Sequence, residues 1–552
     1  MLAPDQFSTH YSQYLEGTYD CVDRIILNGN YSMGFNPGGF RTWWRRLYGH
    51  DDNLNNSNLQ RLSGRLSRRL RAYAKKHNIP VIYTNSASEK KHIIADRYLP
   101  EDPGFCGLFL VIVGRARGFV WDVIRNERGQ ISEIKRKSSQ TFVNHFSFHI
   151  IDPDWGHVTF KICGQPPFAA QIMLNGHEYV ARQAQKNDVP FTKAANCFTS
   201  FPSGPELATI AETLCSPSAV GQLTRLCDRW IYSSCLHFAL SLEEVKRTQF
   251  SYSYSVYQIE YSRNLLFHRG AEMERVVQAM IDGTRSSLDI NTVKTLFGYK
   301  QRPKFRRKGN KINRFEVVLE RPVYDLTVFK LNFGRLSLKV YTKGERLLRI
   351  EVVAHNVKAL RCRRSLPFWA ELVTLIGGML RRFLDVLACV DTSSISRDTW
   401  DELPQPSYVG ATRTPGINLF SPRLRAAIEA VISLAAVPDG FSIRDLTDKV
   451  PRVTAFSENS YSTCNAAYDL RKLRGKGFVE KVPRSHRYRC TTSGLQAIVA
   501  MLVITDKVIR PVLAGAGKPR PGRPRRLNAV DIHYKNLRRE MHKLFDTLRI
   551  AA

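Results

Sequence analysis

Residues 421–494 read SPRLRAAIEAVISLAAVPDGFSIRDLTDKVPRVTAFSENSYSTCNAAYDLRKLRGKGFVEKVPRSHRYRCTTSG, and this stretch decides the fold expected near the C-terminus. Ser421 and Pro422 begin a helix, because serine caps free backbone N–H groups and proline fits the first turn. The apolar residues that follow recur at helical spacing. After a proline–aspartate–glycine turn, Ser442 and Asp445 predict a capping box that opens a short second helix.

A third helix is expected from about residue 460 to residue 475. Two strands, 478–482 and 486–490, then predict a hairpin with a basic tip. Small polar side chains near the start of a helix can reach base edges in a groove of DNA, and arginines of a hairpin can meet phosphates. The outward face of the third helix is predicted to carry Ser462, Asn465, Asp469 and Lys472. The hairpin arginines are Arg484, Arg487 and Arg489.

The order of these elements (helix, short helix, helix, hairpin) is typical of a winged helix-turn-helix. Together with the exit Tyr488-Arg489-Cys490-Thr491-Thr492-Ser493-Gly494, it resembles the MarR-like winged-helix regulators over residues 421–494. In that family the third helix enters the major groove and the wing touches the DNA backbone. The resemblance therefore implies binding to duplex DNA, and a winged helix used only for protein contacts is the alternative.

The composition of the 552 residues favours an anionic partner. Lysine and arginine number 82 against 49 for aspartate and glutamate, so the formal charge is +33. Such an excess makes a polyanion the natural partner. No apolar run approaches the ~20 residues of a spanning helix, and the first residues lack the pattern of a signal peptide. We expect a cytoplasmic, nucleoid-associated protein with no membrane partner.

Eleven cysteines, an odd number with no C-x-x-C spacing, argue for a reducing compartment and against a zinc ribbon. One histidine-rich cluster also falls short of a metal site. His145 and His149 lie ~13 Å apart along one strand, so they cannot share an ion. Asp152 and Asp154 are better explained as turn formers. No metal and no cofactor are expected.

Three further segments concentrate positive charge. Residues 59–77 predict a helix with seven cations and no acid, and a face of one sign repels itself unless it meets an anion. Residues 302–314 form a basic arm. Residues 518–526 resemble an AT-hook, although Pro521 interrupts the motif. The residues of these segments that we expect to contact nucleic acid are Arg61, Arg65, Arg68, Arg306, Arg307, Lys308, Arg523 and Arg525.

The patterns predict an α+β protein of several domains: two mixed α/β domains with mostly antiparallel sheets, then a winged helix-turn-helix. Residues 1–240 form the first domain, with the basic helix 59–77 and a β-hairpin at 141–163. Residues 241–400 form the second, with the basic arm 302–314 and an antiparallel sheet at 314–354. The expected remainder is a linker at 401–417, the winged helix at 418–515 and a basic tail at 516–552, whose final helix docks or forms a homodimer.

The segment Asn175-Gly176-His177-Glu178 has the residue types of a catalytic site. A plainer account is preferred. Asn175 follows a short strand and can cap a helix, and Glu178, three residues later, can complete a capping box. We therefore predict that this segment begins a helix.

Two strands in the second domain are expected to form a hairpin through Lys343-Gly344-Glu345, with glycine available for the left-handed position and with Leu338 paired with Ile350. The same strands carry a candidate nucleophile. Lys339-Val340-Tyr341-Thr342-Lys343 and Leu348-Arg349-Ile350-Glu351 resemble the tyrosine–lysine and arginine–glutamate strands of phage and plasmid rolling-circle initiators. In those enzymes a tyrosine attacks a DNA phosphate with the help of metal-bound carboxylates. The resemblance implies Tyr341 as nucleophile, with Glu351 and Glu316 near Mg²⁺ or Mn²⁺. The histidine-hydrophobe-histidine motif of many such enzymes is absent, and ordinary strand alternation explains the same pattern.

These observations predict a nucleic-acid-binding protein that binds duplex DNA through a winged helix, in a regulatory or architectural role. Two alternatives stay open. One is a DNA-nicking or replication-initiator enzyme of a mobile element, which would use Tyr341 and a divalent metal. The other is an RNA-binding protein. Whether the protein is an enzyme is left open by the sequence.

Overall fold

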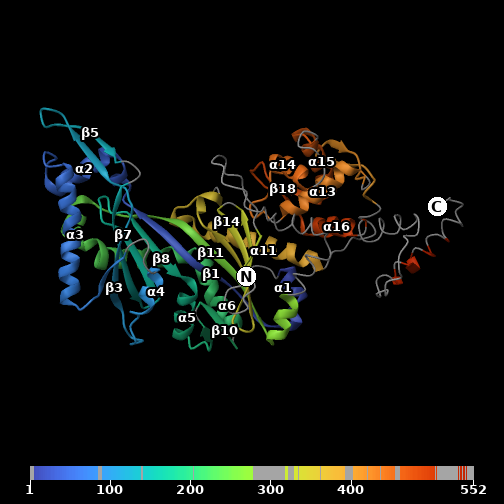
Figure 1. The fold of residues 1–552 in the computed structure, drawn as a ribbon, viewed down its shortest axis with the longest axis horizontal. Helices are drawn as coiled ribbons and strands as arrows, with labels where there is room; N and C mark the ends of the chain where they lie inside the picture. Colours follow the sequence, from blue (N-terminus) through green and yellow to red (C-terminus); the bar gives the residue numbers. More distant parts are fainter. Residues whose placement is uncertain are drawn as a thin grey trace, which may run out of the picture. The chain divides into compact units, whose positions relative to one another are not determined.

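The structure is a computed structural model (Figure 1) in which the chain forms two compact units. The first comprises Met1–Ala3, Gln13–Met273 and Val318–Leu380, and the second comprises Pro4–Ser12, Glu274–Val317 and Arg381–Ala552. The described residues are 5–84, 90–137, 141–194, 196–202, 204–277, 317–320, 328–333, 335–360, 362–391, 402–418, 421–435, 437–453, 461–503, 505, 532–533, 535–537, 539–540 and 543.

One sheet of 11 strands organises the first unit, in the order β12-β13-β14-β15-β11-β1-β8-β7-β6-β3-β2. Its pairs are antiparallel wherever a register is resolved, except that β2 and β3 run parallel. The strands are β1 (Leu15–Asn30), β2 (Val81–Thr84), β3 (Gly107–Arg117), β6 (Phe142–Asp152), β7 (Gly156–Cys163), β8 (Ala170–Asn175), β11 (Ser253–Phe267), β12 (Val317–Glu320), β13 (Val328–Phe333), β14 (Leu336–Lys343) and β15 (Leu347–Ala354). A mostly antiparallel sheet combined with helices is the α+β class expected from the sequence.

The two longest strands, β1 and β11, lie next to each other within this sheet (Figure 1). β11 hydrogen-bonds to β1 on one side and to β15 on the other. The domain boundary expected near residue 240 therefore falls inside a single sheet. Local patterns cannot reveal this, because pairing between strands so distant in sequence leaves no mark on either strand alone.

Helices and two small hairpins complete the first unit. The helices are α2 (Pro37–Tyr48), α3 (Asn56–Lys76), α4 (Lys91–Asp96), α5 (Gly176–Lys186), α6 (Gly204–Glu212), α7 (Ser218–Trp230), α8 (Leu242–Thr248) and α11 (Trp369–Asp391), whose last residues belong to the second unit. The hairpins pair β4 (Trp121–Arg125) with β5 (Ile131–Arg136), and β9 (Thr192–Ala194) with β10 (Cys197–Ser200). On α3, Leu59, Leu62, Leu66 and Leu70 are buried, as their helical spacing predicts.

Two predicted hairpins are present in the sheet. In the β6–β7 turn, Asp152 Oδ1 accepts hydrogen bonds from the backbone N–H groups of Asp154 and Trp155, which is the turn-forming role expected of it. In the β14–β15 turn, Gly344 adopts φ 61°, as predicted. The expected pairing of Leu338 with Ile350 is wrong, because Leu338 pairs with Val352. A shift of two residues keeps each side chain on its expected face.

The second unit contains the predicted sequence of helices and strands near the C-terminus. They are α13 (Pro422–Ala435), α14 (Ile443–Val453), α15 (Thr463–Gly475), β18 (Val479–Lys481), β19 (Tyr488–Cys490) and α16 (Thr492–Val503). The capping box is formed, since Asp445 N–H donates to Ser442 Oγ at 3.2 Å and Ser442 N–H donates to Asp445 Oδ2 at 2.8 Å. The likeness of this segment to winged-helix regulators stays a prediction. Other elements are α1 (Gln6–His10), β16 (Ser407–Val409) and β17 (Thr412–Thr414).

Candidate functional site

A row of polar side chains crosses one face of the sheet in the first unit. The register places Tyr341 of β14 opposite Arg349 of β15. Arg349 lies opposite Asn264 of β11, which in turn lies opposite Tyr19 of β1. Directly opposed residues of antiparallel strands point to the same face. Four neighbouring strands therefore present these side chains together, although they come from both ends of the unit's sequence.

A second row runs beside the first, two residues further along each strand. It contains Lys339, Glu351, Ser262 and Cys21, which are again paired across β14, β15, β11 and β1. Asp23 follows in β1, where the β1–β11 register shifts between Val22 and Ile25. The buried polar cluster is thus assembled from positions that an ordinary strand would fill with apolar side chains.

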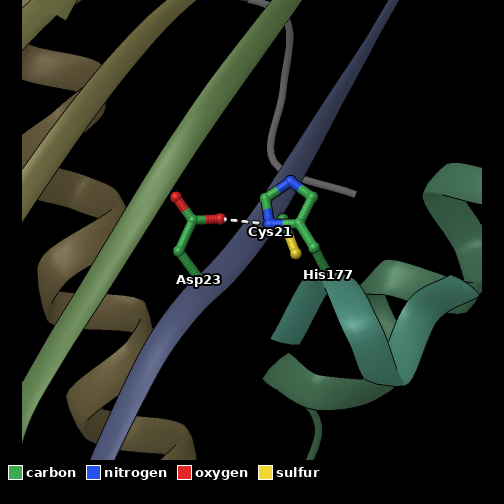
Figure 2. A group of neighbouring side chains, drawn as sticks. All are labelled: Cys21, Asp23 and His177. Atoms are coloured by element: carbon green, nitrogen blue, oxygen red, sulfur yellow. Dashed lines mark ion pairs between the residues drawn. The ribbon is translucent and has the colours of Figure 1, made fainter. Parts of the chain in front are cut away.

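His177 reaches the same place from the start of α5 (Figure 2). Asn175 positions it, because the Asn175 side chain accepts a hydrogen bond from His177 N–H at 3.0 Å and caps the helix, as predicted. His177 Nδ1 lies 2.6 Å from Asp23 Oδ1, and both side chains are buried. Glu178 does not complete the expected capping box. Its carboxylate instead contacts Lys193 and, at 3.9 Å, Arg182.

The contacts of His177 define its protonation. Arg349 Nη2 lies 3.2 Å from His177 Nε2, and a guanidinium can only donate hydrogen bonds. Nε2 must therefore be the unprotonated acceptor, so Nδ1 carries the proton and faces Asp23 Oδ1 at 2.6 Å. Burial lowers the pKa of His177, which keeps the ring neutral.

Arg349 is the buried cation of the cluster. Its Nε donates to Asn264 Oδ1 at 2.6 Å, its Nη2 donates to the carbonyl of Asn196 at 2.7 Å, and its Nη1 lies 3.7 Å from Asp23 Oδ2. Burial alone would raise the pKa of Asp23, but His177 and Arg349 together lower it below its ordinary value. Asp23 thus remains a carboxylate and balances the arginine charge.

Cys21, Asp23 and His177 bring three metal-ligand atoms within 4.8 Å of one another (Figure 2), and no other such group occurs in the part of the chain that the structure describes. A metal would require Cys21 as a thiolate, yet burial raises the pKa of the Cys21 thiol. Arg349 already supplies the positive charge beside Asp23. The three residues therefore fit an ion-paired core and not a divalent metal.

The cluster becomes partly accessible at β14. Tyr341 Oη donates to Glu351 Oε2 at 2.7 Å, and Lys339 Nζ donates to Glu351 Oε1 at 2.8 Å. Tyr341 and Lys339 are half-buried, whereas Glu351 is buried. Burial raises the pKa of Tyr341, so the phenol holds its proton and donates it to the carboxylate. The structure thus brings together two predicted catalytic residues, Tyr341 and Glu351.

Two neighbouring groups have unusual proton affinities. Burial, together with the charge of Glu351, raises the pKa of Glu260 to about 7. Burial, together with the charge of Arg349, lowers the pKa of Lys343 to about 8. This end of the cluster therefore contains a phenol beside a carboxylate, and groups that exchange protons near neutral pH.

The predicted nucleic-acid contacts on α15 are only partly on its surface. Ser462 is exposed, but its hydroxyl caps the helix by accepting from Asn465 N–H at 3.3 Å. Asn465 and Lys472 are half-buried. The expectation that Asp469 faces outward is wrong, because Asp469 is fully buried between Arg423, at 3.0 Å, and Tyr461, at 3.2 Å.

The hairpin arginines differ in their contacts. Arg487 pairs with Asp439 at 3.3 Å and donates to the carbonyl of Gly440, while Arg489 pairs with Glu480 at 2.5 Å. Arg484 is exposed in the turn, and no carboxylate among the described residues pairs with it. Of the three, Arg484 is therefore the side chain best placed to meet a phosphate.

On α3, Arg61 and Arg68 are exposed, as expected. Arg65 is different. Its guanidinium makes two hydrogen bonds to Glu244 of α8, at 2.8 and 3.1 Å, so it is already paired with an acid and is not among the exposed cations of the helix. The acid that neutralises Arg65 is remote in sequence, which is why the charge pattern of the helix alone could not reveal it. The remaining predicted residues, Glu316, Arg306, Arg307, Lys308, Arg523 and Arg525, lie outside the described residues.

Sequence reasoning missed the buried members of the cluster. The available signal was polar residues within otherwise apolar strands: Asp23 in β1, Asn264 in β11 and Arg349 in β15. Such residues are almost never buried without partners. That rule indicates that partners exist, but it does not say which they are.

Comparisons with models of protein families, with curated proteins and with solved structures found no match for this chain. Among the described residues, none of the helices has both the length and the apolar character needed to cross a membrane. Function must therefore be inferred from the chemistry of the residues.

We predict that Asp23→Asn lowers the free energy of unfolding by about 3–5 kcal/mol, because it leaves Arg349 buried without its counter-ion. Denaturant titration of the purified protein measures this. Asp154→Asn is the matched control: Asp154 is a partly exposed aspartate paired with Lys186, and a surface pair contributes about 1 kcal/mol or less. Equal effects of the two substitutions would contradict the assigned role of Asp23.

A second prediction concerns pH. The ordinary pKa of a glutamate is 4.5, and that of Glu260 in the fold is about 7. Between these values the folded protein retains a proton that the unfolded chain has released, so Glu260 makes stability fall as pH rises through this window. As pH rises from 4.5 to about 7, the unfolding free energy of wild type should therefore fall relative to that of Glu260→Gln, which has no carboxylate to titrate at this position. Glu345→Gln, at an exposed turn, should show no such trend.

Proposed function

We propose that this protein binds nucleic acid, with duplex DNA as the preferred form, in a regulatory or architectural role. The observation that carries the proposal is the exposed cationic face of α3. Its exposed cations are Arg61, Arg68, Arg69, Arg71, Lys75 and Lys76. Among the described residues, no carboxylate pairs with any of them. Together with the formal charge of +33, this face is suited to a polyanion.

The geometry of α3 supports a linear anionic partner. The helix has 21 residues, which corresponds to ~30 Å at 1.5 Å per residue. Its like charges repel one another across successive turns. An anionic strand removes that repulsion and gains entropy by releasing its condensed counter-ions. A solvated helix face with no partner would gain more from a mixture of signs.

Features of the second unit support duplex DNA as the form bound. α15 follows the helices α13 and α14 and precedes the β18–β19 hairpin. This is the order of elements found in winged-helix regulators. Arg484 is exposed at the tip of that hairpin, where such proteins touch the DNA backbone. RNA is the alternative ligand. Measuring the affinity for duplex DNA and for RNA at the same salt concentration distinguishes the two possibilities.

The proposal predicts a change in salt dependence. Arg61→Gln combined with Arg69→Gln should lower the slope of log affinity against log salt by about two, since each phosphate contact contributes ~0.9. Fluorescence anisotropy with a short labelled duplex measures the slope. Lys186→Gln is the control, because Lys186 is exposed but already paired with Asp154, and its slope should not change.

An unchanged slope in the double variant would count against α3 as the binding face. The same titration with double-stranded RNA and with single-stranded DNA decides the preferred ligand. Tighter binding to RNA at equal salt would replace duplex DNA with RNA in the proposal.

A second candidate function is cleavage of a DNA strand by Tyr341, and the 2.7 Å hydrogen bond from Tyr341 to Glu351 favours it. Glu351 would accept the phenol proton while Tyr341 Oη attacks a phosphorus atom. The bond from phosphorus to the neighbouring nucleotide oxygen would break, and that oxygen would leave as a hydroxyl after taking a proton. A tyrosyl phosphodiester would remain on the protein.

The described side chains near Tyr341 do not offer a ready site for Mg²⁺ or Mn²⁺. Lys339 already neutralises Glu351, and Glu316 lies outside the described residues. Lys343 is therefore the group assigned to offset the phosphate charge. The sequence led us to expect Mg²⁺ or Mn²⁺ for this candidate, so the cleavage assay is run with and without these ions.

For this candidate, Tyr341→Phe should abolish both nicking of supercoiled plasmid and the covalent protein–DNA adduct, while affinity for DNA is retained. Tyr83→Phe, at an exposed tyrosine of the same sheet, should leave cleavage unchanged. Relaxation of the plasmid on an agarose gel, with Mg²⁺, with Mn²⁺ and with chelator, is the measurement. If wild type cleaves no substrate under these conditions, the candidate is rejected.

A further inference from the structure

A hollow of about 300 Å³ lies in the first unit, lined by residues of α3, of β6 and of the segment directly after β7. It is distinct from the cluster around Arg349 and shares no residue with it. Its volume is at the lower end of the ~300–1,000 Å³ typical of small-ligand pockets.

Small residues keep the hollow open. On α3, Ser63, Gly64 and Ser67 stand beside the buried leucines where larger side chains would fill the space. On the sheet side, Gly164 N–H donates to the carbonyl of Asn144 at 2.8 Å. A Cβ at Gly164 would lie 2.9 Å from that carbonyl oxygen and 2.9 Å from the Phe146 ring, so only glycine fits without a shift.

The lining is cationic, polar and aromatic, and none of its residues is acidic. Arg68 and Arg71 belong to the exposed face of α3, and Arg71 Nη2 donates to Ser67 Oγ at 3.1 Å. Asn144 is exposed and Gln165 is half-buried. The ring of Phe146 is almost fully buried and contributes the aromatic part of the lining.

These groups match the parts of a nucleotide. Guanidinium groups bind phosphate through paired hydrogen bonds. Side-chain amides both donate and accept, as the edge of a base requires. Aromatic rings and guanidinium planes provide surfaces for an unstacked base. A base in a duplex is paired and stacked, so it reaches such a hollow only when it is unpaired.

We propose that this hollow holds one unpaired nucleotide of a bound nucleic acid, with its phosphate at Arg68 and Arg71 and its base edge at Asn144 and Gln165. The proposal rests on the proposed nucleic-acid binding and specifies its substrate as a strand with an unpaired position. Bulged, gapped or mismatched DNA is then preferred to a perfect duplex. A free mononucleotide has the same chemical groups as a nucleotide within a strand, so it is the other ligand that could occupy the hollow.

The test compares a labelled perfect duplex with the same duplex carrying one bulged nucleotide, by anisotropy at fixed salt. Wild type should bind the bulged duplex about tenfold more tightly, as expected for one base edge held by two side-chain amides. Ser67→Leu fills the hollow without changing charge and should equalise the two affinities. Ser57→Leu, on the exposed first turn of α3, is the matched control and should preserve the preference.

Arg68→Gln combined with Arg71→Gln should weaken binding to the bulged duplex more than binding to the perfect duplex. Lys75→Gln combined with Lys76→Gln removes the same charge from the same helix and should weaken both equally. Asn144→Ala, at an exposed position, should reduce the preference even if Ser67→Leu fails to fold.

Equal affinity of wild type for the two duplexes would overturn this inference and leave the proposed function standing. Failure to bind either duplex would overturn the proposed function itself. Binding of a free nucleoside monophosphate would raise the melting temperature of wild type but not of Ser67→Leu. This result, together with no preference of wild type for the bulged duplex, would also overturn the inference.

Discussion

The buried ion pair between Arg349 and Asp23 is the constraint on which the rest of the first unit depends. Removing two charges from water costs several kcal/mol for each ion, and only close partners with well-made hydrogen bonds offset this. Here His177, Asn264 and the carbonyl of Asn196 complete the set. Their elements (β1, β11, β15, the start of α5 and the loop before β10) must therefore adopt their positions together.

This cluster changes in character along the row of strands. At β1 it is fully buried, and its groups are fixed in one protonation state. At β14 it reaches partial exposure, where Tyr341 and Lys339 share Glu351. A rigid interior behind a half-open edge is an arrangement that can hold reactive groups in place. The cationic face of α3 lies apart from these residues in the sequence, and it is the part to which our proposal assigns the attraction for an anion.

Local structure could be predicted from the sequence where short-range patterns decide it. Asn175 as a helix cap, the Asp152 turn and the Gly344 turn depend on neighbouring residues alone, and each was predicted. Long-range pairing could not be predicted in this way: neither the junction of β11 with β1 nor the contact of Arg65 with Glu244 leaves a local signal. The face shared by Tyr341 and Glu351 followed from strand alternation, whereas the approach of His177 and Asp23 to Arg349 required the fold.

The pairing of β1 with β11 has a consequence for how the chain is made. One of the two hydrogen-bonding partners of Leu15–Asn30, the strand Ser253–Phe267, is synthesised more than two hundred residues later. Contacts so distant in sequence form slowly, and a long strand with an unpaired edge invites association with other chains. During synthesis, this edge of β1 therefore stays without its partner until β11 has been made.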